Sequence, residues 1–342
     1  MIKITVIITT YNLENLISKC LKELFSQTFI DFEIIIIDDC STDNTKNIIN
    51  EFIIKYPERI QTIYLEKNQG YASKLRNIVI DSGKIKGEYI IFLDGDDSLE
   101  NNFLENLYKL ANETNSDLSI CAYDRVILET GYVLCKEMQG FPKILNIPPE
   151  NDILSFVNGA LWNKLIKTSI IGDIRDPDFR VGDDTCFSLK LYKNCKLIAF
   201  TDEILIHYQV RRDSVINTIE LENVYSLADE FFNIYNNCND KYLKYSIGLS
   251  AFIHIGISMP IRIKNNRNIS IKKHLIWTYN YFENKYIFFK NNIFFKLKSL
   301  KKHGIKGFGL WMCFCLYKIK LFGIFISLYN VYTILLKKEI KF

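Results

Sequence analysis

The chain has 342 residues, of which 48% are hydrophobic, enough for one large catalytic domain and an appendage. Its formal net charge is only +4, but residues 231–342 hold 19 Lys and Arg against 3 Asp and Glu, so residues 1–230 are acidic. The nine cysteines form no Cys-x-x-Cys pair, which argues against a regularly spaced zinc site or disulfide framework. The opening run Ile2–Thr9 is too short and too β-branched for a signal peptide, so we expect the active part in the cytoplasm.

Apolar runs alternate with helical periodicity through the first 125 residues. Strands are predicted at Ile2–Thr9, Phe32–Ile37, Arg59–Leu65, Tyr89–Leu93 and Leu118–Tyr123. Helices are predicted between them at Leu13–Phe25, Ile48–Tyr56, Tyr71–Asp81 and Phe103–Ala111, the last capped by Ser98. This alternation predicts an α/β fold with a mostly parallel sheet and helices on both faces.

The rest of the chain shows less regular patterns. Residues 128–150 are rich in Gly and Pro and are predicted to form a loop, and Ile153–Ile171 is predicted to be helical. A mixed region continues to about Asn217, followed by helices rich in Phe, Tyr and Lys.

Three polar clusters each follow an apolar strand, at residues 38–43, 68–70 and 94–97. The carboxyl ends of parallel strands meet at one edge of a sheet, where ligands bind, so we expect these clusters to converge. Six Asp residues there would repel one another unless a cation compensates, and acidic oxygens suit Mg²⁺ or Mn²⁺. Neither a phosphate-binding P-loop nor a strand-linked dinucleotide fingerprint is present in the sequence.

The ordered motifs resemble family 2 of the inverting glycosyltransferases, which have the GT-A fold. The matching segments are Val6–Asn12, Phe32–Thr45, Asn68–Asn77, Phe92–Asp97, Trp162–Leu165, Gly182–Phe187 and His207–Ser214. They occur in the family's order and cover about residues 1–217. The resemblance implies a nucleotide-diphospho-sugar transferase with a C-terminal α-helical region added to it.

The resemblance also implies a donor-binding site at the first two clusters. Asp39 would accept a hydrogen bond from the uracil ring, and Thr10 and Asn12 would line the nucleotide pocket. Asn68 belongs to the same nucleotide-binding set, and Arg76 would lie near the base and the diphosphate.

The remaining implied roles concern the metal and the reaction. Asp94 would contact the ribose or the sugar, and Asp96 would bind Mn²⁺ or Mg²⁺. Asp184 would be the general base, and His207 a further metal ligand or a diphosphate contact. One base and one displacement invert the anomeric carbon without a covalent intermediate.

Two departures from the family pattern matter. Asp183 stands where Glu is usual, which affects the placement of the acceptor. The segment from Gln209 to Asp213 is close to the Gln-x-x-Arg-Trp of processive synthases, but it lacks the Trp, and the chain lacks long membrane spans. We therefore expect transfer of a single sugar and not polymerisation.

Each of these residues also has an ordinary structural interpretation. The Asp residues at 38–43 could cap a helix, those at 94–97 could form an acidic turn, and Asp183 and Asp184 could be a solvated pair. His207 could be structural, and Arg76 could pair with a surface carboxylate. Trp162 fits a core aromatic better than a sugar platform.

We divide the chain into a donor-binding half (1–125), an acceptor-binding half (126–217) and a basic, aromatic helical region (218–342). Phe308–Leu336 is very apolar, but its longest uninterrupted run, Leu321–Leu336, falls short of the ~20 residues that a membrane span needs. Interleaved Lys and aromatic residues favour peripheral binding to the anionic cytoplasmic face of a membrane, and packing on the catalytic core is the alternative. No motif supports nucleic-acid binding.

The expected function is transfer of a sugar from a nucleotide-sugar to a saccharide or lipid-linked saccharide, in cell-surface polysaccharide or glycolipid synthesis. We expect the donor to be a UDP-sugar. A non-catalytic partner that binds nucleotide-sugars and a sugar nucleotidyltransferase are the alternatives. The second would carry a Gly-rich basic loop after the first strand, where residues 9–12 read Thr-Thr-Tyr-Asn.

Overall fold

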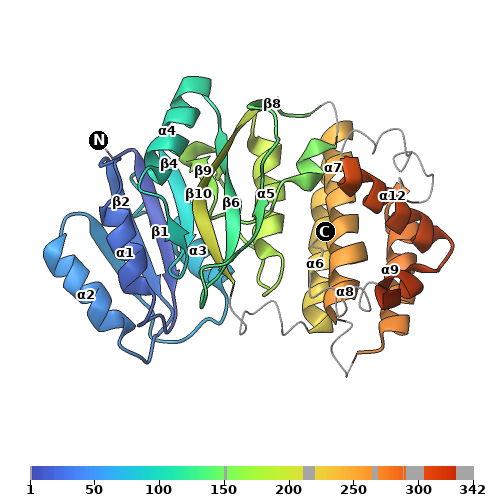
Figure 1. The fold of residues 1–342 in the computed structure, drawn as a ribbon, viewed down its shortest axis with the longest axis horizontal. Coiled ribbons are helices and arrows are strands. Elements are labelled where there is room, and N and C mark those ends of the chain that lie inside the picture. Colours follow the sequence, from blue (N-terminus) through green and yellow to red (C-terminus); the bar gives the residue numbers. More distant parts are fainter. Residues whose placement is uncertain are drawn as a thin grey trace. The chain divides into compact units, whose positions relative to one another are not determined.

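The computed structural model describes residues 2–149, 152–210, 220–263, 269–287, 289 and 304–328 (Figure 1). The chain divides into two compact units. The first unit comprises Met1–Pro149 and Val157–Ser214, and the second comprises Glu150–Phe156 and Val215–Phe342.

A ten-stranded mixed sheet forms the centre of the first unit. Its main path runs β3 (Ile60–Tyr64), β2 (Phe32–Asp38), β1 (Ile4–Thr10), β4 (Tyr89–Asp94), β9 (Lys164–Lys167), β6 (Leu118–Ile127), β10 (Leu197–Val210) and β5 (Ser98–Leu99). The strands β3, β2, β1 and β4 are parallel, as predicted, and β9 joins antiparallel between β4 and β6. Every residue of β2 is buried, which accounts for the apolar run Ile34–Ile37.

Five α-helices lie in the described part of this unit: α1 (Ile17–Phe25), α2 (Thr45–Lys55), α3 (Ala72–Asp81), α4 (Phe103–Thr114) and α5 (Asp183–Asn194). Helix α3 packs against β1 and β2, whereas α4 packs against β6, β9 and β10 (Figure 1). Each buries an apolar stripe, as Ile17, Leu21 and Leu24 do on α1. The predicted α/β fold is confirmed.

The second unit is helical where the structure describes it. It contains a 3₁₀ turn at Ile153–Phe156, then α6 (Leu221–Asn236), α7 (Lys241–Ala251), a π-helical stretch at Phe252–Ser258, α8 (Met259–Ile263), α9 (Ile271–Lys285) and α12 (Gly304–Lys318). Phe252 lies at its core, edge-on to Phe282 and Phe314. The predicted helical C-terminal region is therefore confirmed.

The continuous helix Lys241–Ile263 is long and apolar enough to cross a membrane, and it is the one such helix within the described ranges. However, 72% of its most apolar window is buried inside the protein, as in the core helix of a globular domain. The apolar run Leu321–Leu336 lies partly outside the described residues.

Three local predictions were wrong. Ile153–Ile171 is not one helix, because β9 pairs with both β4 and β6 and breaks it. The predicted loop at 128–150 contains two short strands, β7 (Val133–Glu137) and β8 (Ile144–Asn146). Ser98 does not cap a helix: it lies in β5 and donates to Glu23 Oε1 at 2.8 Å, and α4 begins only at Phe103.

Candidate active site

The carboxyl ends of β1, β2 and β4 lie together at one edge of the sheet. Thr10 of β1 is in register with Asp38 of β2, and Thr9 is in register with Asp94 of β4. Because the three strands are parallel, the polar residues that follow each strand converge, as the sequence predicted.

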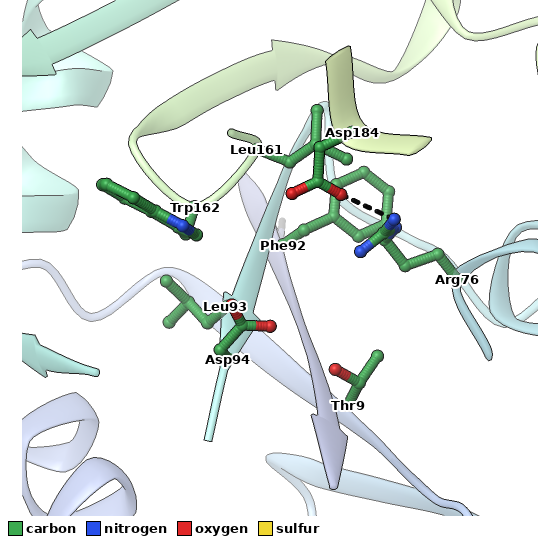
Figure 2. A pocket seen from close by; sticks show the side chains of 8 residues that line it. All are labelled: Thr9, Arg76, Phe92, Leu93, Asp94, Leu161, Trp162 and Asp184. Carbon is green, nitrogen blue, oxygen red and sulfur yellow. Dashed lines mark ion pairs between the residues drawn. The ribbon is translucent and has the colours of Figure 1, made fainter. Parts of the chain in front are cut away.

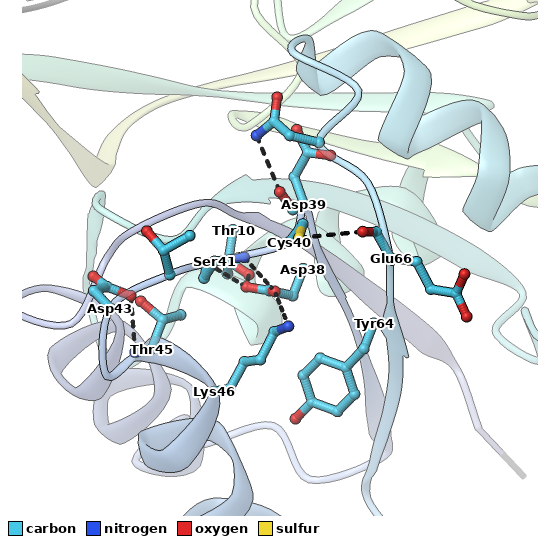
Figure 3. A network of polar contacts seen from close by, with 12 residues as sticks. Thr10, Asp38, Asp39, Cys40, Ser41, Asp43, Thr45, Lys46, Tyr64 and Glu66 are labelled. Carbon is cyan, nitrogen blue, oxygen red and sulfur yellow. Dashed lines mark hydrogen bonds and ion pairs between the residues drawn. The ribbon is translucent and has the colours of Figure 1, made fainter.

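Asp38 organises the loop after β2 (Figure 3). It is fully buried, and its carboxylate accepts hydrogen bonds from the Thr10 hydroxyl (3.1 Å), the Ser41 hydroxyl (2.5 Å) and the Ser41 amide (2.9 Å). The hydroxyl of Thr10 is therefore directed to Asp38, and its neighbour Thr9 lines the pocket described below.

Asp39 joins the first polar cluster to the second. Its carboxylate accepts the backbone N–H of Gln69 (2.6 Å) and of Gly70 (3.1 Å), and Asn68 Nδ2 donates to its carbonyl oxygen (3.0 Å). Gly70 has a φ of 85°, which a side chain would strain, so glycine suits this turn. A carboxylate oxygen has two lone pairs, so Asp39 retains the capacity to accept a further N–H.

Asn12 ties the end of β1 to the same loop. Its backbone N–H donates to Ser41 Oγ (2.9 Å), and its side-chain oxygen accepts the backbone N–H of Thr42 (2.8 Å). Asn12 is exposed and has a φ of 51°, a conformation that Asn adopts more readily than most residues. It therefore lies at the edge of the converged clusters.

Asp94, Asp96 and Asp97 form an acidic triad at the end of β4. One carboxylate oxygen from each lies within 4.8 Å of the others. Three hard oxygen donors at this spacing fit Mg²⁺ or Mn²⁺. The chemistry of the donor set therefore agrees with the predicted metal at Asp96.

A pocket opens beside this triad (Figure 2). It is lined by Thr9, Arg76, Phe92, Leu93, Asp94, Leu161, Trp162 and Asp184. Asp94 and Asp184 come from β4 and from the first turn of α5, two elements far apart in the sequence. The structure thus places the predicted sugar contact and the predicted base at one pocket.

Arg76 is surrounded by carboxylates. It is only 4% exposed, and it pairs with Asp176 (Nε–Oδ2, 2.9 Å), Asp183 (Nη2–Oδ2, 2.7 Å) and Asp184 (Nη2–Oδ1, 2.7 Å). Burial opposes the charge of Arg76, but the three carboxylates raise its pKa well above the ordinary value. Burial and the charge of Asp184 raise the pKa of Asp183.

Two residues of this region were missed by sequence reasoning. Asp176 carried no signal, because its partner lies 100 residues away. Lys164 was noted only as part of a motif, yet it is fully buried and donates to the carbonyl oxygens of Asn158 (2.7 Å) and Ala160 and to Asn163 Oδ1 (2.9 Å). Burial lowers the pKa of Lys164 to about 7, against the opposing charge of Asp184.

Trp162 lies on the loop that Lys164 holds. It is buried, stands edge-on to Tyr123 (ring centroids 4.6 Å apart) and stacks on Tyr208 (5.5 Å). It also lines the pocket. The indole is therefore a core aromatic, with part of it reaching the pocket wall.

His207 lies on β10, opposite Ser98 of β5. Its Nδ1 is 2.7 Å from Asp124 Oδ1, and its Nε2 is 3.0 Å from Glu100 Oε1. Burial opposes the charge of His207, but the hydrogen bonds to these two carboxylates raise its pKa. To bind a metal, the imidazole would have to give up one of the two contacts.

The chain is similar in sequence to known glycosyltransferases. A family model described as glycosyl transferase family 2 matches residues 5–159. A poly(ribitol-phosphate) beta-glucosyltransferase of Bacillus spizizenii is 30% identical over 246 residues, which are 68% of this chain and 36% of the relative. This chain spans about a third of the length of that relative and of the glycosyltransferase GlyA of Streptococcus pneumoniae.

Solved structures show the same fold. The structure of S. aureus TarS 1-349 in complex with UDP-GlcNAc superposes with a TM-score of 0.69 at 19% identity, covering 93% of this chain and 92% of that chain. The mannosyltransferase PcManGT from Pyrobaculum calidifontis, in complex with GDP-Man and Mn²⁺, gives 0.55 at 13% identity, covering 93% and 86%.

Proposed function

Because residues 5–159 are a family 2 glycosyltransferase domain with the GT-A fold, we propose that the chain transfers one sugar from a UDP-sugar to an acceptor hydroxyl, with inversion. The observation that carries this proposal is the pocket that Asp94 and Asp184 line together, beside the acidic triad. The acceptor belongs to a cell-surface polysaccharide or glycolipid, a class that the poly(ribitol-phosphate) relative supports.

The nucleotide binds at the converged loops in this proposal. Asp39 accepts the uracil N–H with its remaining lone pairs, while Asn68 and the amides of Gln69 and Gly70 hold it in place. Thr10 supports the site through Asp38, and Asn12 borders it. The UDP-GlcNAc complex of a protein with the same fold supports UDP as the nucleotide.

Asp94, Asp96 and Asp97 would hold Mn²⁺ or Mg²⁺. When bound, the cation offsets the negative charge that grows on the diphosphate as the glycosidic bond breaks. His207 remains a predicted metal ligand, which the Mn²⁺ affinity of His207→Gln would test. Asp184 takes the proton of the acceptor hydroxyl, and a single displacement turns an α-linked donor into a β-linked product.

We also propose a cytoplasmic protein whose C-terminal region binds the anionic face of a membrane. Residues 231–342 carry the 19 basic against 3 acidic residues, and Ile319, Ile324 and Leu328 are more than half exposed. Cosedimentation with vesicles containing anionic lipid, compared with neutral vesicles, tests this. An absence of binding at low salt would contradict it.

The donor site is tested by thermal denaturation with UDP, GDP, TDP and CMP, each with and without Mn²⁺. We expect a metal-dependent stabilisation by UDP. Stabilisation by another nucleotide would overturn the uracil assignment, and no stabilisation by any of them would favour a non-catalytic role.

The reaction is tested with Asp184→Asn, measured as UDP release from UDP-glucose and UDP-GlcNAc with a poly(ribitol phosphate) or oligosaccharide acceptor. We expect UDP stabilisation to persist and transfer to fall about 10²–10⁴-fold. Asp178→Asn is the matched control, since Asp178 lies nearby on the surface and pairs with Lys74. Unchanged transfer in Asp184→Asn would show that another group is the base.

A further inference from the structure

Arg76 and Asn77 of α3 are bonded to the loop that leads into α5. Asn77 Nδ2 donates to the carbonyl oxygen of Asp176 (2.9 Å), and the N–H of Asp176 donates back to Asn77 Oδ1 (2.8 Å). Arg76 Nε and Nη2 donate to the two oxygens of the Asp176 carboxylate, at 2.9 and 3.2 Å. Four hydrogen bonds, two of them a bidentate charged pair, fix the guanidinium against this loop.

The same guanidinium reaches the predicted base. Arg76 Nη2 is 2.7 Å from Asp184 Oδ1, a contact that Figure 2 shows at the wall of the pocket. Asp184 is flanked by the carboxylates of Asp183, from its own helix, and Asp176, from the loop, and by the guanidinium of Arg76 from α3. The charge of Lys164, from β9, also interacts with Asp184. One guanidinium is thus shared among three carboxylates, and one of them faces the pocket.

From this geometry we propose that Arg76 is a positioning residue for Asp184, held in place by Asn77 and Asp176, and is not a ligand of the nucleotide. The proposal rests on the proposed function, because it takes Asp184 as the base. A general base must lie within hydrogen-bonding reach of the acceptor hydroxyl, and a displacement of 1 Å can cost about a hundredfold in rate. The ion pair holds Oδ1 of Asp184 against the guanidinium, which leaves the other carboxylate oxygen for the acceptor.

The experiment compares Arg76→Lys and Asp176→Asn with the wild type. Lysine keeps the charge but cannot contact three carboxylates in the geometry of a planar guanidinium. In Asp176→Asn, an amide NH₂ group faces a guanidinium donor and breaks the bidentate pair. We expect kcat to fall roughly ten- to a hundredfold in both variants, with the donor KM and the stabilisation by UDP and Mn²⁺ within about twofold of wild type.

Lys74→Gln is the matched control. Lys74 pairs with Asp178 at 3.1 Å, so it joins the same helix to the same loop, but this pair is exposed and lies outside the pocket lining. We expect Lys74→Gln to leave kcat and the donor KM unchanged. Each variant is checked for folding by its melting temperature without ligand, and Asp176→Asn carries the test if Arg76→Lys does not fold.

Three results would overturn the proposal. Loss of UDP stabilisation in Arg76→Lys at unchanged kcat would make Arg76 a nucleotide ligand. Unchanged kcat in Asp176→Asn would show that Asp176 does not hold the guanidinium for catalysis. A fall in kcat of the same size in Lys74→Gln would show that any contact between this helix and this loop matters, and not the guanidinium. Failure of the proposed function is distinguishable, because the wild type itself would then neither bind a nucleotide nor transfer a sugar.

Discussion

Lys164 at the start of β9 carries its amine in the protein interior, and Lys164→Met tests what that amine contributes. The side chain is 0% exposed and donates to three oxygens of the loop 158–163, which carries the pocket residues Leu161 and Trp162. Methionine has a similar length and volume but no donors, so packing changes little. The variant leaves three acceptor oxygens without their donor, at about 1–3 kcal/mol each.

Burial of the amine acts in the opposite direction, and the size of its cost depends on pH. Burial lowers the pKa of Lys164 from 10.5 to about 7, so between these values the unfolded chain holds the additional proton. The free energy of unfolding of the wild type therefore rises with pH across this window, by up to about 1.4 kcal/mol per pH unit. The cost of burying the amine is about 4 kcal/mol at pH 7 and about 2 kcal/mol at pH 9 on this basis.

The assay is urea denaturation of both proteins at pH 7, 8 and 9. At pH 7 the lost hydrogen bonds and the relieved burial cost largely offset each other. Between pH 7 and 9 the wild type should gain about 2 kcal/mol relative to Lys164→Met. Lys86→Met, at a lysine whose side chain is 65% exposed, should show no such difference. Parallel pH profiles for the wild type and Lys164→Met would refute the reasoning and show that the three acceptors keep the amine protonated.

Three further predictions concern Asp183, Asp96 and His207. Burial raises the pKa of Asp183, so its contribution to stability falls as pH rises through the folded value. At pH 8, Asp183→Asn should raise the free energy of unfolding by on the order of 1 kcal/mol, measured through a higher melting temperature, and at pH 4 it should change little. Asp96→Asn should weaken Mn²⁺ binding about tenfold or more by isothermal titration, and unchanged affinity would locate the metal elsewhere. Despite burial, the hydrogen bonds to Asp124 and Glu100 raise the pKa of His207, so their stabilisation is complete below about pH 6.5 and is lost as pH rises through the folded value. His207→Gln should therefore lower the melting temperature more at pH 6 than at pH 9, and unchanged Mn²⁺ affinity at pH 8 would rule out a ligand role.

The convergence of the polar clusters could be predicted because its signals are local. Each of β2, β3 and β4 is followed by one of the polar clusters, and parallel pairing, with β1 between β2 and β4, places those clusters at one edge. The contact of Asp39 with the Gln69 and Gly70 amides follows from this convergence. Knowledge of the strand order was not needed.

The segment around β9 could not be predicted in the same way. The apolar residues between Ile153 and Ile171 fit a helical period, and only pairing with β4 and β6 makes 164–167 a strand. The burial of Lys164 has the same origin, since a lysine between apolar residues also fits a helix whose charged side chain reaches solvent. Tertiary contacts decide between the two, and no local pattern encodes them.

The two acidic groups have a similar spacing in the structure, but a guanidinium lies within one of them. Asp176, Asp183 and Asp184 lie within 4.8 Å of one another, as do Asp94, Asp96 and Asp97. In the first group Arg76 supplies the compensating charge from within the chain. Arg76→Met should then leave buried carboxylates unpaired and destabilise the fold by about 3–5 kcal/mol.

Mn²⁺ should recover part of that stability, because the emptied group offers three oxygen ligands to a hard cation. The measurement is the melting temperature of both proteins over a Mn²⁺ titration without nucleotide. We expect a larger stabilisation of Arg76→Met than of the wild type, and its loss when Asp176→Asn is added. An equal response of the two proteins would mean that the guanidinium does not take the place of a metal among these carboxylates, and that their spacing is set by the fold alone.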